Sequence, residues 1–200
     1  MPIDPGEAPQ AAIAAAEKAI NAPGFPKPAS RDAFAKTLER SFPHRVEALS
    51  LDQIEQGSND LRRMTQPRGW RFLVHNGPNA AFAAVRVAAA DGNDDYSLGD
   101  LSEGRFVAGT EAAVRFAEME VDGRFEAVLL MAPELRVAVL WLRSLDGGED
   151  FILTMPSSHK ADTEPRKSRV MTTAAFLTTM RDLAKAARSR RQESEPGPHR

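Results

Sequence analysis

Two nearly continuous apolar runs lie close together in the second half of the chain. They cover residues 125–131 and 135–142, and only Ala132-Pro133-Glu134 stands between them. A strand loses its alternation of apolar and polar residues when both of its faces are buried. The two runs therefore predict central strands of a sheet that is covered on both faces, or that packs against a second subunit on one of them.

Three shorter runs predict the rest of the sheet. The first covers residues 70–75, where apolar and polar side chains alternate. The turn residues 76–79 join it to a second run at 82–89, and we expect the two runs to pair as a hairpin. Residues 151–153 predict one further strand.

Capping signals predict two helices ahead of the hairpin. Ser30 is a suitable N-cap for a helix over residues 31–41. Ser50 and Gln53 have the spacing of a capping box, which predicts a second helix over residues 51–64, although a glycine inside it weakens the pattern.

The clearest helical period in the chain covers residues 170–188. Its apolar stripe predicts a helix that packs on the sheet, and the stripe consists of Phe176, Leu177, Met180, Leu183, Ala184 and Ala187. Residues 10–21 predict a short alanine-rich helix that is either docked or loose. We expect residues 96–109 to form a loop with a short extended piece, whereas residues 110–119 fit a helix or a strand equally.

Together these elements predict an α+β fold. We expect an antiparallel sheet of about four to six strands, with N-terminal helices and a long C-terminal helix packed against it. The expected organisation is a flexible Ala/Pro-rich segment over residues 1–28, a single domain over 29–188 and a disordered tail over 189–200.

Composition argues against several classes of protein. The 200 residues include no cysteine, which excludes disulfides, thiol catalysis and cysteine-ligated metals. No apolar run approaches the ~20 residues that a membrane-spanning helix needs, and no signal-like leader is seen. We therefore expect a cytoplasmic protein without membrane insertion. The net charge of −2 disfavours nucleic acid as the main partner, and no motif indicates a cofactor.

One histidine and one loop are candidates for catalysis and metal binding. His75 ends a predicted strand and is the candidate general base, because imidazole titrates near neutral pH. A half-exposed strand residue without a catalytic role is the alternative. Asp91, Asn93 and Asp95 have the oxygen spacing of a calcium loop, but the glycine and glutamate that follow in such loops are missing. A solvated turn is the alternative there.

One tryptophan and three arginines are candidates for binding. Trp70, at the start of a strand, is either an exposed aromatic anchor or a core residue. Arg188, Arg190 and Arg191 end the stretch 160–191, which holds nine Lys and Arg against three acidic residues. These arginines would either hold RNA, DNA or an acidic partner, or complement the dipole of the last helix.

The apolar central sheet and the charged ends favour a non-catalytic role. We expect a protein-interaction or accessory protein, such as an adaptor, an assembly or secretion accessory, a dedicated chaperone or an inhibitor. Its partner would be another protein or a second copy of the chain. The alternatives are a small hydrolase-like enzyme that uses His75 and the acidic residues of 91–103, and a weak nucleic-acid binder through the basic C-terminal helix.

Overall fold

The structure is a computed structural model that describes residues 3–23, 25, 42–75, 81–89, 95–155 and 169–194. The helix expected over 31–41 and the turn expected over 76–79 lie outside the described residues.

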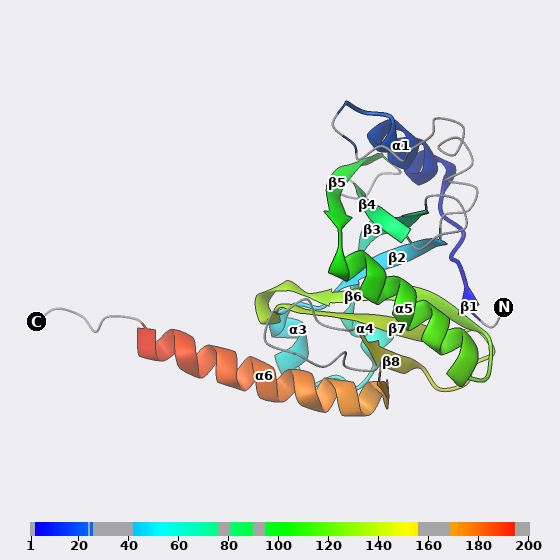
Figure 1. The fold of residues 1–200 in the computed structure, drawn as a ribbon. Coiled ribbons are helices and arrows are strands. Elements are labelled where there is room, and N and C mark those ends of the chain that lie inside the picture. Colours follow the sequence, from blue (N-terminus) through cyan, green and yellow to red (C-terminus); the bar gives the residue numbers. More distant parts are fainter. Residues whose placement is uncertain are drawn as a thin grey trace, which may run out of the picture.

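Within the described residues, a mixed sheet of nine strands organises the molecule (Figure 1). Its order is β5-β4-β3-β2-β6-β7-β8-β9, and β1 pairs with β6 beside the end of β2. The strands are β1 (Ile3–Asp4), β2 (Phe42–Ala48), β3 (Gln66–His75), β4 (Ala81–Ala89), β5 (Tyr96–Glu103), β6 (Phe125–Ala132), β7 (Val137–Ser144), β8 (Phe151–Thr154) and β9 (Val170–Thr172). The α+β character and the long C-terminal helix are confirmed.

The expected strand number was too small. The predicted strands correspond to β3, β4, β6, β7 and β8, and the predicted hairpin is the antiparallel pair β3–β4. The strands not predicted carry weak signals, because β1 and β9 are two and three residues long. Two longer strands, β2 and β5, were also not predicted. β5 is exposed along most of its length and so lacks the apolar alternation of a half-buried strand.

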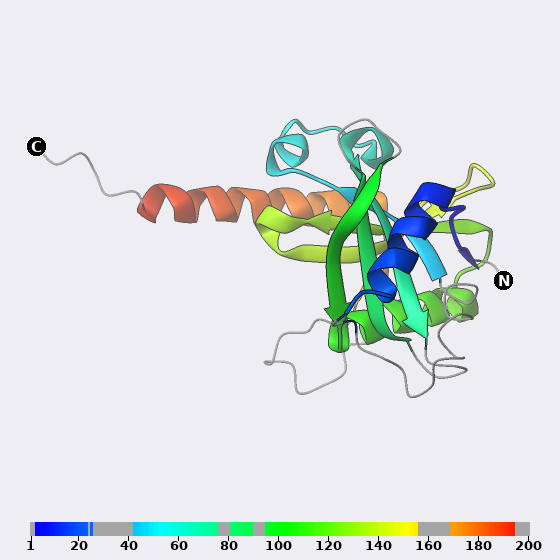
Figure 2. The same ribbon diagram turned by 90° about the horizontal axis from the view of Figure 1, so that it is seen from above.

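Helices and a short 3-10 turn surround this sheet. They are α1 (Gln10–Ile20), α3 (Leu51–Glu55), α4 (Leu61–Met64), α5 (Arg105–Glu120), η1 (Pro133–Leu135) and α6 (Thr173–Ser194). Figure 2 shows α5 on one side of the sheet and α3 and α4 on the other. The sheet is therefore covered on both faces, as its continuous apolar strands require.

Residues that pair across neighbouring strands share a face of the sheet, and one such face carries Trp70 and Trp141. Trp70 pairs with Arg45, Arg45 with Val128 and Val128 with Trp141, so their side chains share one face of the sheet. On this face α1 covers β3 and β4, and its alanines pack on Trp70 and on other residues of the two strands. Residues 3–4 and 10–20, expected within a flexible segment, thus form β1 and the docked helix α1.

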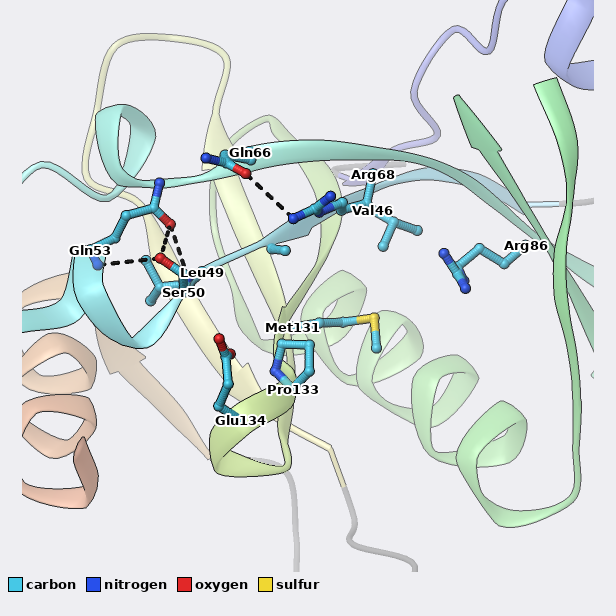
Figure 3. Close-up of a pocket in the computed structure, with 11 residues that line it drawn as sticks. Val46, Leu49, Ser50, Gln53, Gln66, Arg68, Arg86, Met131, Pro133 and Glu134 are labelled. Carbon is cyan, nitrogen blue, oxygen red and sulfur yellow. Dashed lines mark hydrogen bonds between the residues drawn. The ribbon is translucent and has the colours of Figure 1, made fainter. Parts of the chain in front are cut away.

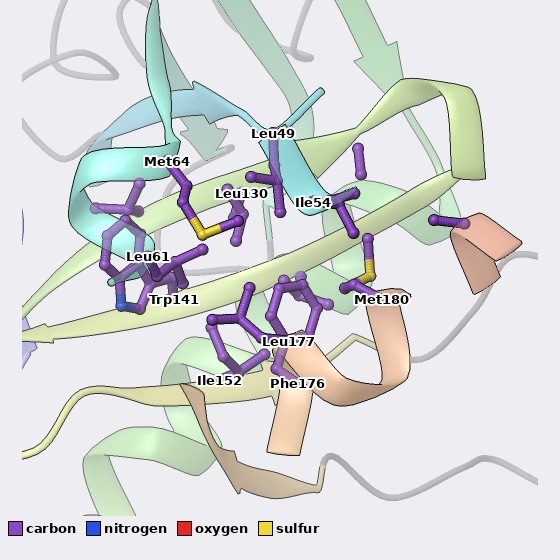
Figure 4. Close-up of a cluster of buried hydrophobic side chains, with 14 of the residues drawn as sticks. Leu49, Ile54, Leu61, Met64, Leu130, Trp141, Ile152, Phe176, Leu177 and Met180 are labelled. Atoms are coloured by element: carbon purple, nitrogen blue, oxygen red, sulfur yellow. The ribbon is translucent and has the colours of Figure 1, made fainter. Parts of the chain in front are cut away.

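The same face carries the largest core cluster, under α3, α4 and α6 (Figure 4). Trp141 of β7 is fully buried in this cluster. Its indole Nε1 donates to Asp150 Oδ2 at 3.2 Å, so the one polar atom of the ring is satisfied. Burial would raise the pKa of Asp150, but hydrogen bonds from Arg62, the Ser144 N–H and Trp141 hold that pKa below its ordinary value.

Ion pairs cover the sheet between α1 and the α3–α4 region. Arg45 Nε lies 2.8 Å from Glu126 Oε1, and Arg143 bridges Glu126 and Glu47. Thr65 donates a hydrogen bond to the second oxygen of Glu47. These contacts explain why β2 contains polar residues. Because of those residues, its sequence lacks the apolar pattern that predicts a strand.

The helix expected over 51–64 is two short helices. Its capping box is present, because the Ser50 hydroxyl accepts from the Gln53 N–H and the Gln53 side chain accepts from the Ser50 N–H. Gly57 has φ +78°, which ends the first helix and allows the chain to turn before Asp60 caps the second.

The prediction of a loop over 96–109 was wrong, and residues 110–119 are helical. The loop region contains β5, and α5 begins at Arg105. Residues of α5 with three- and four-residue spacing are buried against the other face of the sheet, among them Val107, Thr110, Val114 and Ala117. That spacing is the helical period.

The last helix begins later and ends later than expected. Residues 170–172 form β9, and α6 continues to Ser194. Phe176, Leu177 and Met180 are buried, whereas Leu183 is 38% exposed. Figure 1 and Figure 2 both show the C-terminal part of α6 projecting beyond the sheet.

Candidate functional site

The parallel pair β2–β6 lies at the centre of an otherwise largely antiparallel sheet. Both strands point the same way, so their carboxyl ends meet at one edge. From there the chain passes to β3 on one side of the pair and to β7 on the other. In open parallel α/β sheets, ligands bind outside the carboxyl ends of the strands, at the point where the connections diverge.

A pocket of about 290 Å³ occupies this position (Figure 3). We call it the switch-point pocket. Its lining residues are Val46, Ala48, Leu49, Ser50, Gln53, Gln66, Arg68, Arg86, Met131, Pro133 and Glu134. These residues come from β2, β3, β4, β6 and the segments that follow β2 and β6, so only the assembled sheet creates the pocket.

Two arginines form the basic wall of the switch-point pocket. Arg68 is exposed, and its Nη2 donates to Gln66 Oε1 at 3.4 Å. Arg68 has no carboxylate within 4.0 Å among the described residues. Arg86 Nε donates to Asp100 Oδ2 at 2.7 Å, and the guanidinium lies against Gly99, where a Cβ would be 3.1 Å from Arg86 Cζ. Arg86 is thus held in place, while Arg68 retains free donors.

The opposite wall is formed by the segments that follow β2 and β6. Glu134 of η1 is exposed and makes no hydrogen bond or ion pair with another described residue. Gln53 uses its Oε1 to accept from Ser50, which leaves its amide NH₂ free to donate. Figure 3 shows Glu134 and Gln53 on the side of the pocket away from Arg86.

Apolar side chains lie between these two polar walls. They are Val46, Ala48, Leu49, Met131 and Pro133. A pocket with an apolar surface and a few placed polar groups is typical of ligand sites. It suits a molecule with an anionic group at the arginines, an apolar part in the middle and a hydrogen-bond donor at Glu134.

Comparisons with known proteins add no family. No family model, curated protein or solved structure matches the chain.

The structure gives His75 a partner that the sequence did not indicate. Its Nε2 lies 3.6 Å from Glu111 Oε1 of α5, and Glu111 also accepts from the Ala81 N–H at 2.8 Å and from Arg115 at 2.6 Å. The Nδ1 atom of His75 is buried and has no hydrogen-bond partner within the described part of the chain. A carboxylate beside an imidazole can orient the ring, although a general base also needs a ring nitrogen that the substrate can reach.

Trp70 is a core residue, because only 3% of its surface is exposed. Arg45 lies over the ring at 4.9 Å, and Gly6 approaches it so closely that a Cβ there would be 2.8 Å from Trp70 Cζ3. The structure thus gives the core alternative for this residue and not the exposed anchor.

The basic candidates lie along α6. Arg188 forms ion pairs with Asp52 and Glu55 of α3, so it fastens the helix to the body. Arg190 Nε donates to the Ala186 carbonyl at 3.1 Å. Arg191 belongs to the helix, but its side chain lies outside the described part of the structure.

Of the three calcium candidates, only Asp95 is described; Asp91 and Asn93 lie outside the described residues. Within the described ranges, no group of three or more His, Cys, Asp and Glu is placed to hold a metal ion. No described helix is both long and apolar enough to span a bilayer.

A buried polar pair lies on the face that α5 covers. His44 and Arg71 are neighbours across β2 and β3. Burial, together with the nearby Arg71 charge, lowers the pKa of His44 to about 3, and burial lowers the pKa of Arg71 to about 10. Arg71 Nη1 donates to Thr110 Oγ1 at 2.9 Å, while its Nε and Nη2 have no hydrogen-bond partner among the described residues.

Sequence reasoning did not identify the switch-point pocket. Arg86 was a partial signal, because it is the one charged residue inside an apolar strand. Arg68 precedes the alternating run, and Glu134 lies between the two apolar runs. Nothing in the sequence indicates that these three residues lie near one another.

Proposed function

We propose that the chain is a non-catalytic protein-interaction protein that binds an extended segment of a partner in the switch-point pocket. The observation that carries this proposal is the apolar lining between Arg68 and Glu134, two oppositely charged side chains without ion-pair partners among the described residues.

The size of the pocket favours a segment of chain over a cofactor. Ligand pockets commonly range from roughly 300 to 1,000 Å³, and 290 Å³ is at the lower limit. Such a volume holds one or two side chains. The remainder of a longer ligand would then lie outside the pocket, as in the peptide-binding grooves of interaction proteins.

The chemistry of the walls defines the segment. A carboxylate would accept from Arg68 and Arg86, and guanidinium groups pair with carboxylates through two parallel hydrogen bonds. An apolar side chain would contact Met131 and Pro133. A backbone N–H or a basic group would donate to Glu134. The expected motif is an acidic residue near an apolar one.

An arrayed library of pentapeptides tests this proposal. We expect the protein to retain peptides that place Asp or Glu beside a large apolar residue. Arg68→Glu should weaken binding of the best peptide at least about tenfold, because a hydrogen bond to a charged group is worth about 1.5–3 kcal/mol. Isothermal titration calorimetry would measure the change.

Arg124→Glu is the matched control. Arg124 is an exposed arginine just before β6, at the opposite end of that strand from the pocket. The control should bind as the wild type does. Enrichment of basic peptides, or equal affinity of the wild type and Arg68→Glu, would contradict the proposal.

The pairing of His75 with Glu111 favours a second candidate function, hydrolysis with His75 as general base. The rate of p-nitrophenyl acetate hydrolysis by wild type and by His75→Ala would test it. A lower rate for the variant supports the enzyme, and equal rates remove His75 from consideration.

A further inference from the structure

The strand β5 is an open edge of the sheet. It pairs with β4 on one side and has no strand on its other side within the described residues. Leu98 and Leu101 are 54% and 39% exposed on this edge. An edge strand with unpaired backbone groups and exposed apolar side chains is a template for pairing with another strand.

A β-bulge brings the two leucines to the same face. Leu98 pairs with Val87 and Leu101 with Val85, while Gly99 is an extra residue beside the Arg86–Asp100 pair. Val85 and Val87 both belong to the cluster under α1. Because paired residues share a face, Leu98 and Leu101 point to the face that α1 covers, although they are three positions apart.

The bulge also makes the face pattern of β5 symmetric. Tyr96, Leu98, Leu101 and Glu103 share the α1 face, because each pairs with a residue on that face; Ser97, Asp100 and Ser102 pair with residues on the other. The pattern therefore reads the same in both directions from the Gly99–Asp100 bond. A strand with this pattern is its own complement in antiparallel pairing.

We infer that β5 pairs antiparallel with β5 of a second copy of this chain, about a two-fold axis between Gly99 and Asp100. Leu98 then lies opposite Leu101 of the second copy, Ser97 opposite Ser102 and Tyr96 opposite Glu103. A two-fold interface requires this reciprocity, in which residue i contacts residue j and j contacts i.

The charges of the edge fit a second copy. Asp100 lies opposite Gly99 of the second copy and keeps its ion pair with Arg86 at 2.7 Å. Glu103 lies opposite a tyrosine, whose hydroxyl can donate to it. No carboxylate of β5 is directly opposite another; the two Asp100 residues are diagonal neighbours across the axis, and the ion pair of each with its own Arg86 offsets their repulsion. The assembly stops at two copies, because the open edge of each β5 is then paired.

Analytical ultracentrifugation of the full chain tests the interface. We expect a concentration-dependent species of about 44 kDa, twice the 21.8 kDa chain. Pairing of one short edge buries little area, so the samples should reach about 0.3 mM, within the range of weak complexes. Leu98→Lys should abolish the dimer. Met119→Lys, on a residue of α5 that is 74% exposed, should leave it intact.

A cysteine pair tests the register directly, because the chain has no cysteine of its own. The double variant Ser97→Cys with Ser102→Cys places a thiol opposite a thiol, within the Cα separation that a disulfide accepts. Oxidation should give a covalent dimer. Ser97→Cys alone should give none, because its two copies would be about 16 Å apart along the strands.

The remaining outcomes would overturn the inference. A monomer at all concentrations means that this edge does not self-associate. A dimer that survives Leu98→Lys and does not cross-link uses another surface. If the protein stays a monomer but binds a synthetic basic peptide as an added strand, and Leu98→Lys loses this binding, then the edge binds a different protein. None of these results bears on Arg68 and its peptides, so the two proposals fail independently.

Discussion

At the scale of single residues, burial of polar groups determines how the protein responds to acid. His44 is fully buried and donates through Nδ1 to the Phe42 carbonyl at 3.0 Å. Its Nε2 has no hydrogen-bond partner in the described ranges, and the charged neighbour Arg71 opposes its protonation. The neutral imidazole is therefore the form that the folded protein accommodates.

Stability should fall as the pH drops below about 6.5. The pKa of His44 is about 3 in the folded protein and near the ordinary histidine value of 6.5 in the unfolded chain, so only the unfolded chain takes up this proton within that window. The stabilisation is complete above pH 6.5 and is lost as the pH falls toward 3. The slope from this residue is up to about 1.4 kcal/mol per pH unit.

Urea unfolding at several pH values between about 5 and about 7.5 measures this slope. His44→Asn keeps an N–H donor at the position of Nδ1 for the Phe42 carbonyl but does not titrate, so its unfolding free energy should depend less steeply on pH than that of the wild type. Parallel curves for the two proteins would contradict the assignment of the proton to His44.

At the scale of elements, packing decides which residues of α6 matter. The helical period predicted the apolar stripe, and its members Phe176, Leu177 and Met180 are buried in the core. Leu183 belongs to the same sequence pattern but lies toward solvent, while the smaller Ala184 contacts the core. Periodicity marks a broad face of a helix, and only the neighbours show which part of that face is covered.

Leu177→Ala should lower the free energy of unfolding by about 2–5 kcal/mol, because it removes a fully buried side chain and leaves a cavity. Leu183→Ala, the same substitution on the same helix, should cost about 0.5 kcal/mol or less. Urea unfolding of both variants measures the difference. Equal losses would mean that α6 packs on the body with a different face.

At the scale of the whole molecule, the N-terminal residues belong to the folded body. Ile3 is buried beside β6, and Ala12 and Ala16 of α1 are buried against the sheet. Alanines allow the helix backbone to approach the strands closely. This composition resembles that of a flexible segment, which is why it did not indicate docking.

Ala16→Asp should release α1 or destabilise the whole protein by about 1–3 kcal/mol, because it buries a carboxylate without a partner. Ala14→Asp, on the exposed side of the same helix, should have little effect. Hydrogen–deuterium exchange of residues 10–20 is the measurement. Rapid exchange of these amides already in the wild type would show that the helix is not docked.

The sequence by itself determined the elements whose signals are local. Residues that are close together in the chain are enough to predict these elements. They are the capping box at Ser50, the hairpin β3–β4, the apolar strands β6 and β7 and the stripe of α6. Tertiary structure decided the parallel pairing of β2 with β6, the exposed edge β5 and the switch-point pocket. These features join residues that lie far apart in the chain. Their stability comes from contacts that exist only after folding, so no local pattern encodes them.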